Sequence, residues 1–358
     1  MEDDTREVWQ AAARADSALQ LREEHWPLLR AKRLLPEPYS RARMFEAMSR
    51  AEPVLFTGFT VPIARRNGES IAEAAEFLIR NGFPPKNTAR VQLGPSRLKT
   101  RKRVPEIMAR WSRRRALVGV IDLHFRGTTL ATNLGIEVLS DFNVLTTGSE
   151  AMGEQEMMTV VIASGGNVTT AHTDDPDGSN HCFTGRKLWM VWESFEGSAK
   201  GIQDSSRDEC DGEPHFDLDT FLTLESASWW TITPGQTLFL PGKMTHRVVT
   251  LEHYLGIGSF YVGLPGCIQT IARWHEHEPI WVSRHREYAG VLDEVTRALT
   301  ARIRMLRDAS AADRERWGVS YVRDSVVQWE SREPEEKRRT LLEHASFVEL
   351  LEVARDAV

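Results

Sequence analysis

Residues 163–193 read ASGGNVTTAHTDDPDGSNHCFTGRKLWMVWE, and the interpretation of the whole chain depends on this stretch. A strand is expected to run into His172-Thr173-Asp174, and a polar loop rich in Gly, Asp, Pro and Asn follows. Gly185 then turns the chain into a second apolar strand. Side chains at positions i and i+2 of a strand lie on the same face, so His172 and Asp174 can direct an imidazole and a carboxylate toward one point.

The region around this stretch, from about residue 118 to residue 262, holds short apolar runs separated by Gly, Asn, Asp and Pro. Runs of this length and spacing are typical of the strands in an antiparallel sandwich or barrel. We therefore expect a mainly β core. The expected strands, including one short earlier run, are 53–59, 117–122, 142–147, 157–163, 187–192, 228–233, 236–240 and 255–262.

Helical patterns precede the β region. Apolar residues recur at helical spacing over residues 5–50, where Pro36 and Pro38 interrupt the pattern. Residues 70–81 form a further candidate helix, because a serine stands at the N-cap position and an apolar stripe follows it. We predict that residues 1–115 form an N-terminal helical flank with a short leading strand.

The chain turns helical again after Pro265. Apolar residues recur every three or four positions over 287–306 and 335–357. We therefore predict a β core at residues 116–265 and a C-terminal helical region at residues 266–358.

The composition excludes several classes of protein. The chain has 358 residues, 41% of them hydrophobic and 27% charged, which is the balance of a globular protein. No apolar run approaches the roughly 20 residues of a membrane span. The N-terminus is acidic and does not resemble a signal peptide, and the three cysteines lack CxxC spacing. We expect a cytoplasmic protein without a membrane partner.

A third candidate metal ligand is His246. It follows a strand, a Pro-Gly turn, a second strand and a second Pro-Gly turn, so a tight hairpin would present it at the mouth of the β core. Together, His172, Asp174 and His246 supply the two imidazoles and one carboxylate of the facial triad of non-haem Fe(II) oxygenases. The other cluster of histidines and acids, at 275–278, is interpreted as a solvated turn.

Lys187 begins an apolar run that contains two tryptophans, where an unpaired ammonium group is costly. A metal enzyme that uses a 2-oxo acid needs a cation for the far carboxylate of that acid, and Lys187 stands where it could fill this role. The alternative is that Lys187 merely starts the strand and extends its ammonium group to solvent. The presence of the three ligand candidates favours the first interpretation.

With these residues in view, the chain resembles the JmjC (Jumonji C) cupin-type family of Fe(II)- and 2-oxoglutarate-dependent oxygenases. The resemblance is clearest over residues 155–262. It rests on three motifs, which are Thr169-x-x-His172-x-Asp174, Gly185-Arg-Lys187-x-Trp189, and Pro234-Gly235 to Pro241 followed by His246.

The resemblance implies a double-stranded β-helix, or jelly-roll cupin, core with helical flanks. It implies that Fe(II) is bound by the three candidate ligands and that 2-oxoglutarate and O2 are cosubstrates. Hydroxylation of a C–H bond, with release of succinate and CO2, would follow. The expected cosubstrate contacts are Lys187 and Thr169, with Asn180 and Ser259 as weaker assignments. The family also implies a homodimer through the C-terminal helices, although these helices could simply pack on the core.

Three other functions remain open on the sequence. An N-methyl demethylase would share the same chemistry, but an Asp at position 174 favours the hydroxylase branch. A Zn or Mn isomerase or hydrolase would use similar ligands, but Lys187 and Thr169 have no purpose in such an enzyme. A non-catalytic binding module should lack a ligand, and this chain has all three.

The substrate is less well indicated. Residues 97–115 hold nine basic residues and one acid, a strip that would suit an acidic peptide or RNA. The favoured interpretation is a solvated helix face, with Pro105 in its first turn and Ile107, Met108 and Trp111 buried. Nucleic acid is not the expected partner. A small molecule is slightly favoured over a peptide or protein side chain as substrate.

Overall fold

The structure is a computed structural model, and it describes most of the chain. The described residues are 4–59, 61–93, 99–113, 117–121, 123–125, 128, 130, 142–144, 158–174, 176–202, 216–242, 244–284 and 290–357. The expected strand at 142–147 lies largely outside these residues, and no strand is assigned at 142–144, its described part.

The N-terminal part contains helices together with two short strands. Ser70 caps helix α4 and forms a capping box with Glu73, which satisfies two backbone N–H groups that the helix itself leaves unbonded. The elements of this part are α1 (Thr5–Ala15), α2 (His25–Ala31), β1 (Glu37–Pro38), α3 (Arg41–Arg50), β2 (Val54–Thr57) and α4 (Ile71–Gly82).

A β-hairpin follows α4 where the sequence predicted no strands. Strands β3 (Thr88–Leu93) and β4 (Lys99–Arg103) pair antiparallel, and helix α5 (Val104–Ser112) begins directly after them. Pro105 stands in the first turn of α5, and Ile107, Met108 and Trp111 are buried. The helix predicted inside the basic strip is therefore confirmed, but the residues before it form an edge strand.

Ten strands form the larger sheet. Its order is β1-β2-β12-β9-β14-β7-β5-β3-β4, with β6 paired to β7, and all pairs except β1–β2 are antiparallel. Its remaining strands are β5 (Val118–Ile121), β6 (Leu123–His124), β7 (Met158–Ala163), β9 (Asp177–Thr184), β12 (Thr237–Leu240) and β14 (Tyr254–Tyr261). Strand β9 occupies the segment that the sequence predicted as a polar loop.

Four strands form the smaller sheet, which is antiparallel throughout and has the order β11-β10-β13-β8. The strands are β8 (Val168–Thr173), β10 (Lys187–Glu193), β11 (Ser228–Ile232) and β13 (Met244–Thr250). The chain passes back and forth between the two sheets from β7 to β14. A mainly β core with helical flanks is therefore confirmed.

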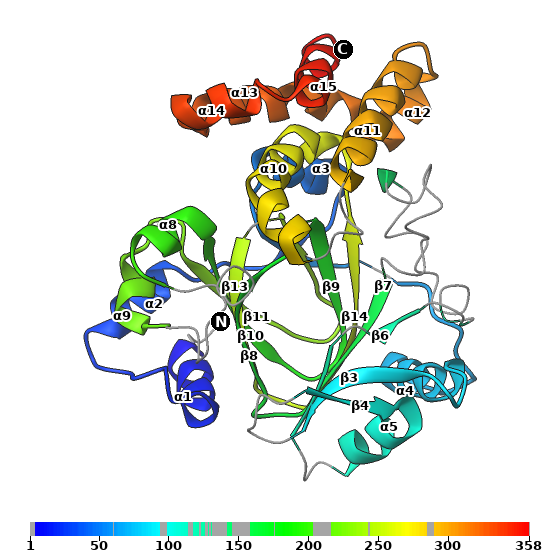
Figure 1. The fold of residues 1–358 in the computed structure, drawn as a ribbon. Helices are drawn as coiled ribbons and strands as arrows, with labels where there is room; N and C mark the ends of the chain where they lie inside the picture. Colours follow the sequence, from blue (N-terminus) through cyan, green and yellow to red (C-terminus); the bar gives the residue numbers. More distant parts are fainter. Residues whose placement is uncertain are drawn as a thin grey trace.

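The two sheets face each other across a shared apolar core (Figure 1). Trp189 and Trp230 of the smaller sheet meet Leu238 and Tyr254 of the larger one there. The outer face of the smaller sheet packs against α1, α2 and the short helix α9 (Leu218–Thr223). The outer face of the larger sheet packs against α4 and α5. Inward and outward side chains alternate along each strand, so this layering determines which residues can reach a site between the sheets.

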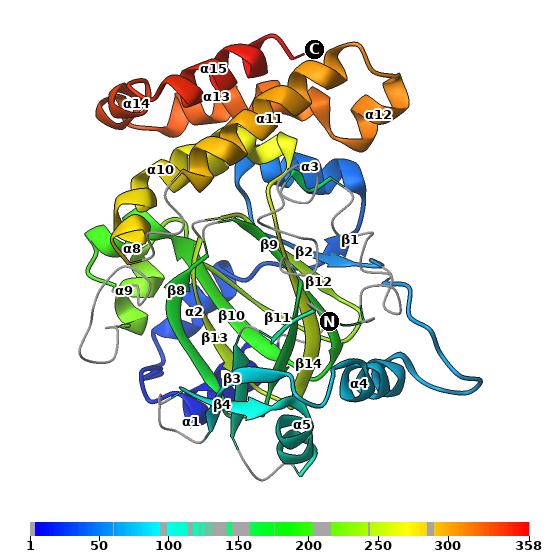
Figure 2. The same cartoon turned by 45° about the vertical axis from the view of Figure 1, so that its right-hand side comes forward.

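The C-terminal helices form a separate layer at one end of the β core, next to α3 (Figures 1 and 2). Helix α10 contains residues 275–278, so the solvated turn expected there is wrong, and His275 is buried. The segment predicted as one helix at 335–357 forms two helices. The helices of this layer are α10 (Cys267–Arg284), α11 (Val291–Arg307), α12 (Ala311–Arg316), α13 (Val322–Arg332), α14 (Glu335–Leu341) and α15 (Ala345–Arg355). The short helix α8 (Ser194–Ala199), which follows β10, lies near the same end. Within the described residues, no helix is long and apolar enough to cross a membrane.

Candidate metal centre

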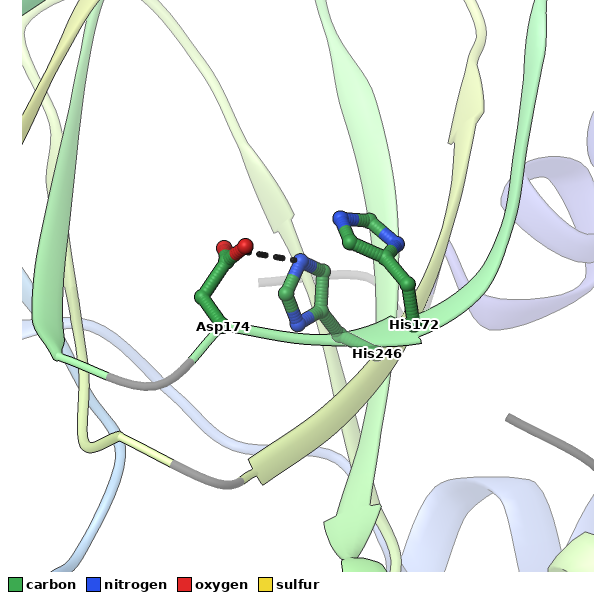
Figure 3. Close-up of side chains that lie close together, drawn as sticks. All are labelled: His172, Asp174 and His246. Carbon is green, nitrogen blue, oxygen red and sulfur yellow. Dashed lines mark ion pairs between the residues drawn. The ribbon is translucent and has the colours of Figure 1, made fainter. Parts of the chain in front are cut away.

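His172, Asp174 and His246 lie together on the smaller sheet (Figure 3). His172 is near the end of β8, Asp174 directly follows that strand, and His246 is on β13. The pairing register places His172 directly opposite His246. One potential ligand atom from each residue lies within 4.8 Å of the other two. The structure therefore brings together the three ligand candidates that were predicted from the sequence.

Both imidazoles are held by their own strands. His172 Nδ1 is 2.8 Å from the carbonyl oxygen of Thr170, and His246 Nδ1 is 3.1 Å from that of Met244. A carbonyl oxygen only accepts hydrogen bonds, so each Nδ1 carries the proton and donates it. Each Nε2 then keeps its lone pair, which is the form of histidine that binds a metal.

The surroundings of His246 restrict its ring further. The ring stacks on Trp189, with centroids 5.1 Å apart and planes inclined by 29°, and the residue is only 3% exposed. The Asp174 side chain is 38% exposed, so the site meets solvent on this side. The orientations of the two imidazole rings are thus fixed before any ion binds. The more exposed carboxylate of Asp174 would be the third ligand.

The spacing of the three groups fits a first-row divalent ion. His246 Nε2 lies 3.7 Å from Asp174 Oδ2. Ligand bonds of about 2.1 Å at right angles would place two donor atoms about 3 Å apart, so a small movement of the carboxylate closes the site. Two histidines and one carboxylate suit non-haem Fe(II) and leave positions for other ligands.

Lys187 is buried on the same inner face of the smaller sheet. Lys187, Trp189 and Val191 are at every second position of β10 and so share one face, and Val191 pairs with His246. Lys187 is thus four residue steps, or about 13 Å of backbone, from the level of the candidate metal ligands. Lys187 is only 5% exposed, and among the described residues no carboxylate forms an ion pair with it. Burial lowers the pKa of its ammonium group to about 8.

Tyr254 is the nearest aromatic neighbour of that ammonium group, and the sequence reasoning missed it. Lys187 Nζ lies 4.3 Å from the centroid of the Tyr254 ring, which is a cation–π contact. The Tyr254 hydroxyl donates a hydrogen bond to Asn180 Oδ1 on β9, and burial raises the pKa of this phenol, so it stays a neutral donor. Asn180 therefore contacts Lys187 through Tyr254. The glycine two positions after Tyr254 was the indication in the sequence. A Cβ at Gly256 would lie 2.8 Å from the Tyr254 ring, so a glycine there leaves room for an inward-facing ring.

A β-bulge in β8 places Thr169 on the same face as the metal ligands. Thr169 pairs with Val248 and His172 pairs with His246, so two residues of β8 lie opposite the single residue Arg247 of β13. Val248 and His246 are two positions apart and share a face. Thr169 and His172 therefore share that face as well, although they are three positions apart.

Ser259, in contrast, is not brought to this cluster. On β14 it pairs with Met158 of β7, and Met158 belongs with Leu255 and Ile257 to the apolar layer under α4 and α5. Alternation therefore directs Ser259 to the outer face of the larger sheet. Side chains alternate between the two faces along β14, and the neighbouring position Gly258 is the one that faces inward.

Gly185 makes the turn that leads into Lys187. Its backbone has φ of +88°, a conformation that glycine adopts without the steric cost of a side chain. A Cβ at this position would lie 2.1 Å from the carbonyl oxygen of His253. Only glycine at this position therefore allows the turn to approach the backbone of His253 so closely.

Comparison with known proteins adds no assignment: no protein-family model matches the chain, and no curated protein matches it either.

Proposed function

We propose that the protein is an Fe(II)- and 2-oxoglutarate-dependent dioxygenase of the JmjC cupin type that hydroxylates an unactivated C–H bond. The strand order supports the fold part of this proposal. Strands β12-β9-β14-β7 and β11-β10-β13-β8 form two facing antiparallel sets of four. The chain alternates between the two sets except at β10 and β11, which are consecutive and pair in the same sheet. Eight strands in two facing sheets are the jelly-roll pattern, of which the double-stranded β-helix is a form.

The donor set supports the metal. His172, Asp174 and His246 would bind the ion through two Nε2 atoms and one carboxylate oxygen. When bound, Fe(II) with 2-oxoglutarate and O2 supplies oxidative decarboxylation to succinate and CO2, coupled to hydroxylation of the substrate. The protein holds the imidazoles in the binding tautomer and orientation, so little rearrangement accompanies ion binding.

The buried ammonium group of Lys187 is the observation that carries the proposal. A cation inside an apolar core is costly unless an anion joins it, and the described residues supply no carboxylate. The distal carboxylate of 2-oxoglutarate would complete this pair, and Thr169 would donate a hydrogen bond to the same group. A Zn or Mn isomerase or hydrolase has no use for such an anchor, so Lys187 favours the oxygenase.

Apolar side chains would exclude bulk water from the interior side of the site, away from the exposed carboxylate of Asp174. Trp189 and Trp230 are 8% and 1% exposed, and both line the core between the sheets next to His246 and Lys187. A dry environment strengthens the pairing of Lys187 with a carboxylate and protects reactive species from side reactions. Small molecules and peptide or protein side chains both remain candidate substrates.

Anaerobic calorimetry provides the first test. We expect 2-oxoglutarate to bind the Fe(II)-loaded protein, and we expect binding to be lost in Lys187→Met. His172→Ala should abolish metal binding, whereas His344→Ala, which changes an exposed histidine on the C-terminal layer, should not. A failure of 2-oxoglutarate to bind the metal-loaded protein would favour a metal-dependent isomerase or hydrolase instead.

Turnover provides the second test. Succinate release with Fe(II), 2-oxoglutarate and O2 should rise when the correct member of a metabolite and peptide panel is added. Formaldehyde in the same assay would identify an N-methyl demethylase rather than a hydroxylase. Substrate-dependent succinate release that survives His172→Ala would show that the metal assignment is wrong.

A homodimer through the C-terminal helices also belongs to the proposal. Met305 on α11 and Val327 on α13 are 56% and 53% exposed, so each of these helices carries a large apolar side chain on its surface that a second copy could cover. Light scattering should report a dimer for the native protein and a monomer for a variant with Met305→Glu and Val327→Glu. An unchanged mass would show that these helices do not form the contact.

A further inference from the structure

Strand β4 forms one end of the larger sheet. The strand order ends at β4, which pairs with β3 on one side only, and the described residues place no strand on its other side. The hairpin lies at the end of the molecule opposite the C-terminal helices (Figures 1 and 2). An edge strand of this kind has backbone N–H and C=O groups along one side that are available for pairing with another chain.

One face of the β3–β4 hairpin carries a concentration of positive charge. Arg90 of β3 lies directly opposite Arg101 of β4, and Arg103 follows two positions later on the same face. All three are exposed, and the opposite face of β3 is buried through Ala89 and Val91. The arginines therefore point away from the protein core.

Little within the fold compensates this charge. Among the described residues, Arg90 and Arg101 form no ion pair, and Arg103 meets Glu106 at 3.4 Å in a pair whose members are 67% and 48% exposed. Exposed pairs contribute little, and like charges directly opposite on two strands destabilise a hairpin. The chain as a whole has a net charge of −6. The stability of the hairpin does not explain a local excess of arginine in an acidic protein.

We propose that β4 is a docking strand for an extended, acidic segment of a partner protein. Such a segment would pair its backbone with the free side of β4 and place carboxylates at alternate positions beside Arg101 and Arg103, while Arg90 on the next strand adds to the positive charge of the same face. Residues two apart repeat every 6.6–6.8 Å, roughly, in both strands, so acidic side chains on one face stay in register with the arginines. Backbone pairing supplies affinity in this mode of recognition, and alternate side chains supply specificity.

The same charges select against other partners. A second copy of this chain would bring its own arginines against β4, so the edge resists self-association while it admits a segment of opposite charge. Single-stranded nucleic acid is recognised by a basic groove combined with aromatic stacking, and neither β3 nor β4 contains an aromatic residue. An acidic peptide therefore fits the hairpin better than RNA does.

This docking strand is independent of the proposed oxygenase chemistry, and its test needs neither metal nor 2-oxoglutarate. Fluorescence anisotropy would be measured with the full chain and a labelled short peptide of alternating Glu and Thr. A Gln-Thr peptide is the charge control. An alternating Glu-Thr peptide that is N-methylated at every second residue keeps its charge but loses the backbone donors along one edge. We expect the unmodified acidic peptide to bind at least about tenfold more tightly than either control.

Matched variants locate the site. Arg90→Glu with Arg101→Glu should weaken binding at least about tenfold, whereas lysine at both positions should retain most of it. Arg297→Glu with Arg339→Glu changes net charge equally at exposed positions on α11 and α14 and should leave binding unchanged. Equal binding of the N-methylated peptide, equal loss in the two charge-reversed variants, or tighter binding of single-stranded oligothymidylate would each overturn the proposal. The N-methylation result decides the matter even if a variant fails to fold.

Discussion

Arg247 donates two hydrogen bonds to the carboxylate of Asp16, from Nε at 2.7 Å and from Nη2 at 2.8 Å. The side chains are only 3% and 5% exposed. Arg247 directly follows the candidate metal ligand His246 on β13, and Asp16 is the C-cap residue of α1. This pair therefore fastens the N-terminal helix to the outer face of the strand whose inner face carries His246.

Asp16→Ala should lower the free energy of unfolding by about 3–5 kcal/mol, because it leaves a buried guanidinium group without its partner. Urea denaturation measures the change. Glu349→Ala is a matched control, since it removes an Arg304 partner in a pair that is 53% and 47% exposed, and it should cost less than about 1 kcal/mol. Asp16→Leu combined with Arg247→Met should recover much of the loss. Similar costs for Asp16→Ala and Glu349→Ala would contradict this account of the pair.

Burial of Lys187 predicts a pH dependence. Its folded-state pKa of about 8 is below its unfolded value, so the folded protein binds fewer protons than the unfolded chain above that pH. The free energy of unfolding of the ligand-free protein should gain a contribution as pH rises from about 8 toward the usual lysine pKa. That contribution should be absent in Lys187→Met. Urea denaturation at several pH values measures it, and identical profiles for the two proteins would refute it.

The affinity for 2-oxoglutarate should change in the opposite direction, because only the charged ammonium group pairs with a carboxylate. Affinity should fall as pH rises above about 8. Lys187→Arg should bind more weakly, because a guanidinium fork does not match the shape of a site for one ammonium group, but its affinity should not vary over this range. Calorimetry of the metal-loaded proteins tests this, and a parallel decline in both would assign the pH dependence to another group.

Gly185 and Gly201 form a natural pair for testing the turn before Lys187. The φ angles are +88° at Gly185 and +87° at Gly201. An added Cβ would collide with the backbone at Gly185, whereas none of the described residues would lie within 4 Å of a Cβ at Gly201. Alanine at either position carries the cost of the left-handed conformation. Gly185→Ala should cost about 1–3 kcal/mol more than Gly201→Ala, because the clash adds to that cost. Thermal unfolding of the two variants measures the difference, and equal melting temperatures would argue against the close approach.

Thr169 and Ser259 should behave differently toward 2-oxoglutarate. Thr169→Val keeps the shape of the side chain and removes the hydroxyl, so affinity should fall about three- to tenfold. Ser259→Ala should leave affinity unchanged, because the side chain is on the outer face and its buried Oγ has no hydrogen-bond partner among the described residues. Calorimetry on the Fe(II)-loaded variants checks both. A loss confined to Ser259→Ala would show that the face assignment is reversed.

The positions of the three candidate ligands at strand ends were predictable from the sequence because they depend largely on local rules. His172 and Asp174 are two residues apart, and a pair of Pro-Gly turns precedes His246. Helices α4 and α5 were predictable for the same reason, since capping residues and apolar stripes act within a few turns. The exception is the pairing of β13 with β8, which brings His246 opposite His172 and joins residues far apart in the chain.

Strand β9 was missed because its composition, Asp177 to Thr184, is that of a loop. Its polar residues are satisfied by partners far away in sequence. His181 hydrogen-bonds Thr237 Oγ1 at 2.7 Å, and Asn180 accepts from Tyr254. Two neighbouring strands, β12 and β14, pair with it on either side. Tertiary pairing therefore overrides local propensity here, as β propensity depends strongly on context.

The faces of the strands were the other unpredictable feature. Ser259 was placed by analogy at the cosubstrate site, but alternation along β14 directs it outward. Thr169 reaches the inner face only because of the bulge in β8. A bulge shifts the alternation by one residue, and its location depends on pairing across strands rather than on local sequence.

That bulge also determines how the site would respond to a change in chain length. At the present chain length, a regular β8 without the bulge would place Thr169 opposite Val249 and turn its side chain to the outer face. Loss of one residue at position 170 or 171 would instead remove the bulge and leave Thr169 and His172 two positions apart, so both side chains would stay on the inner face. The segment between the threonine and the first histidine can therefore shorten by one residue without moving either side chain to the other face of the sheet.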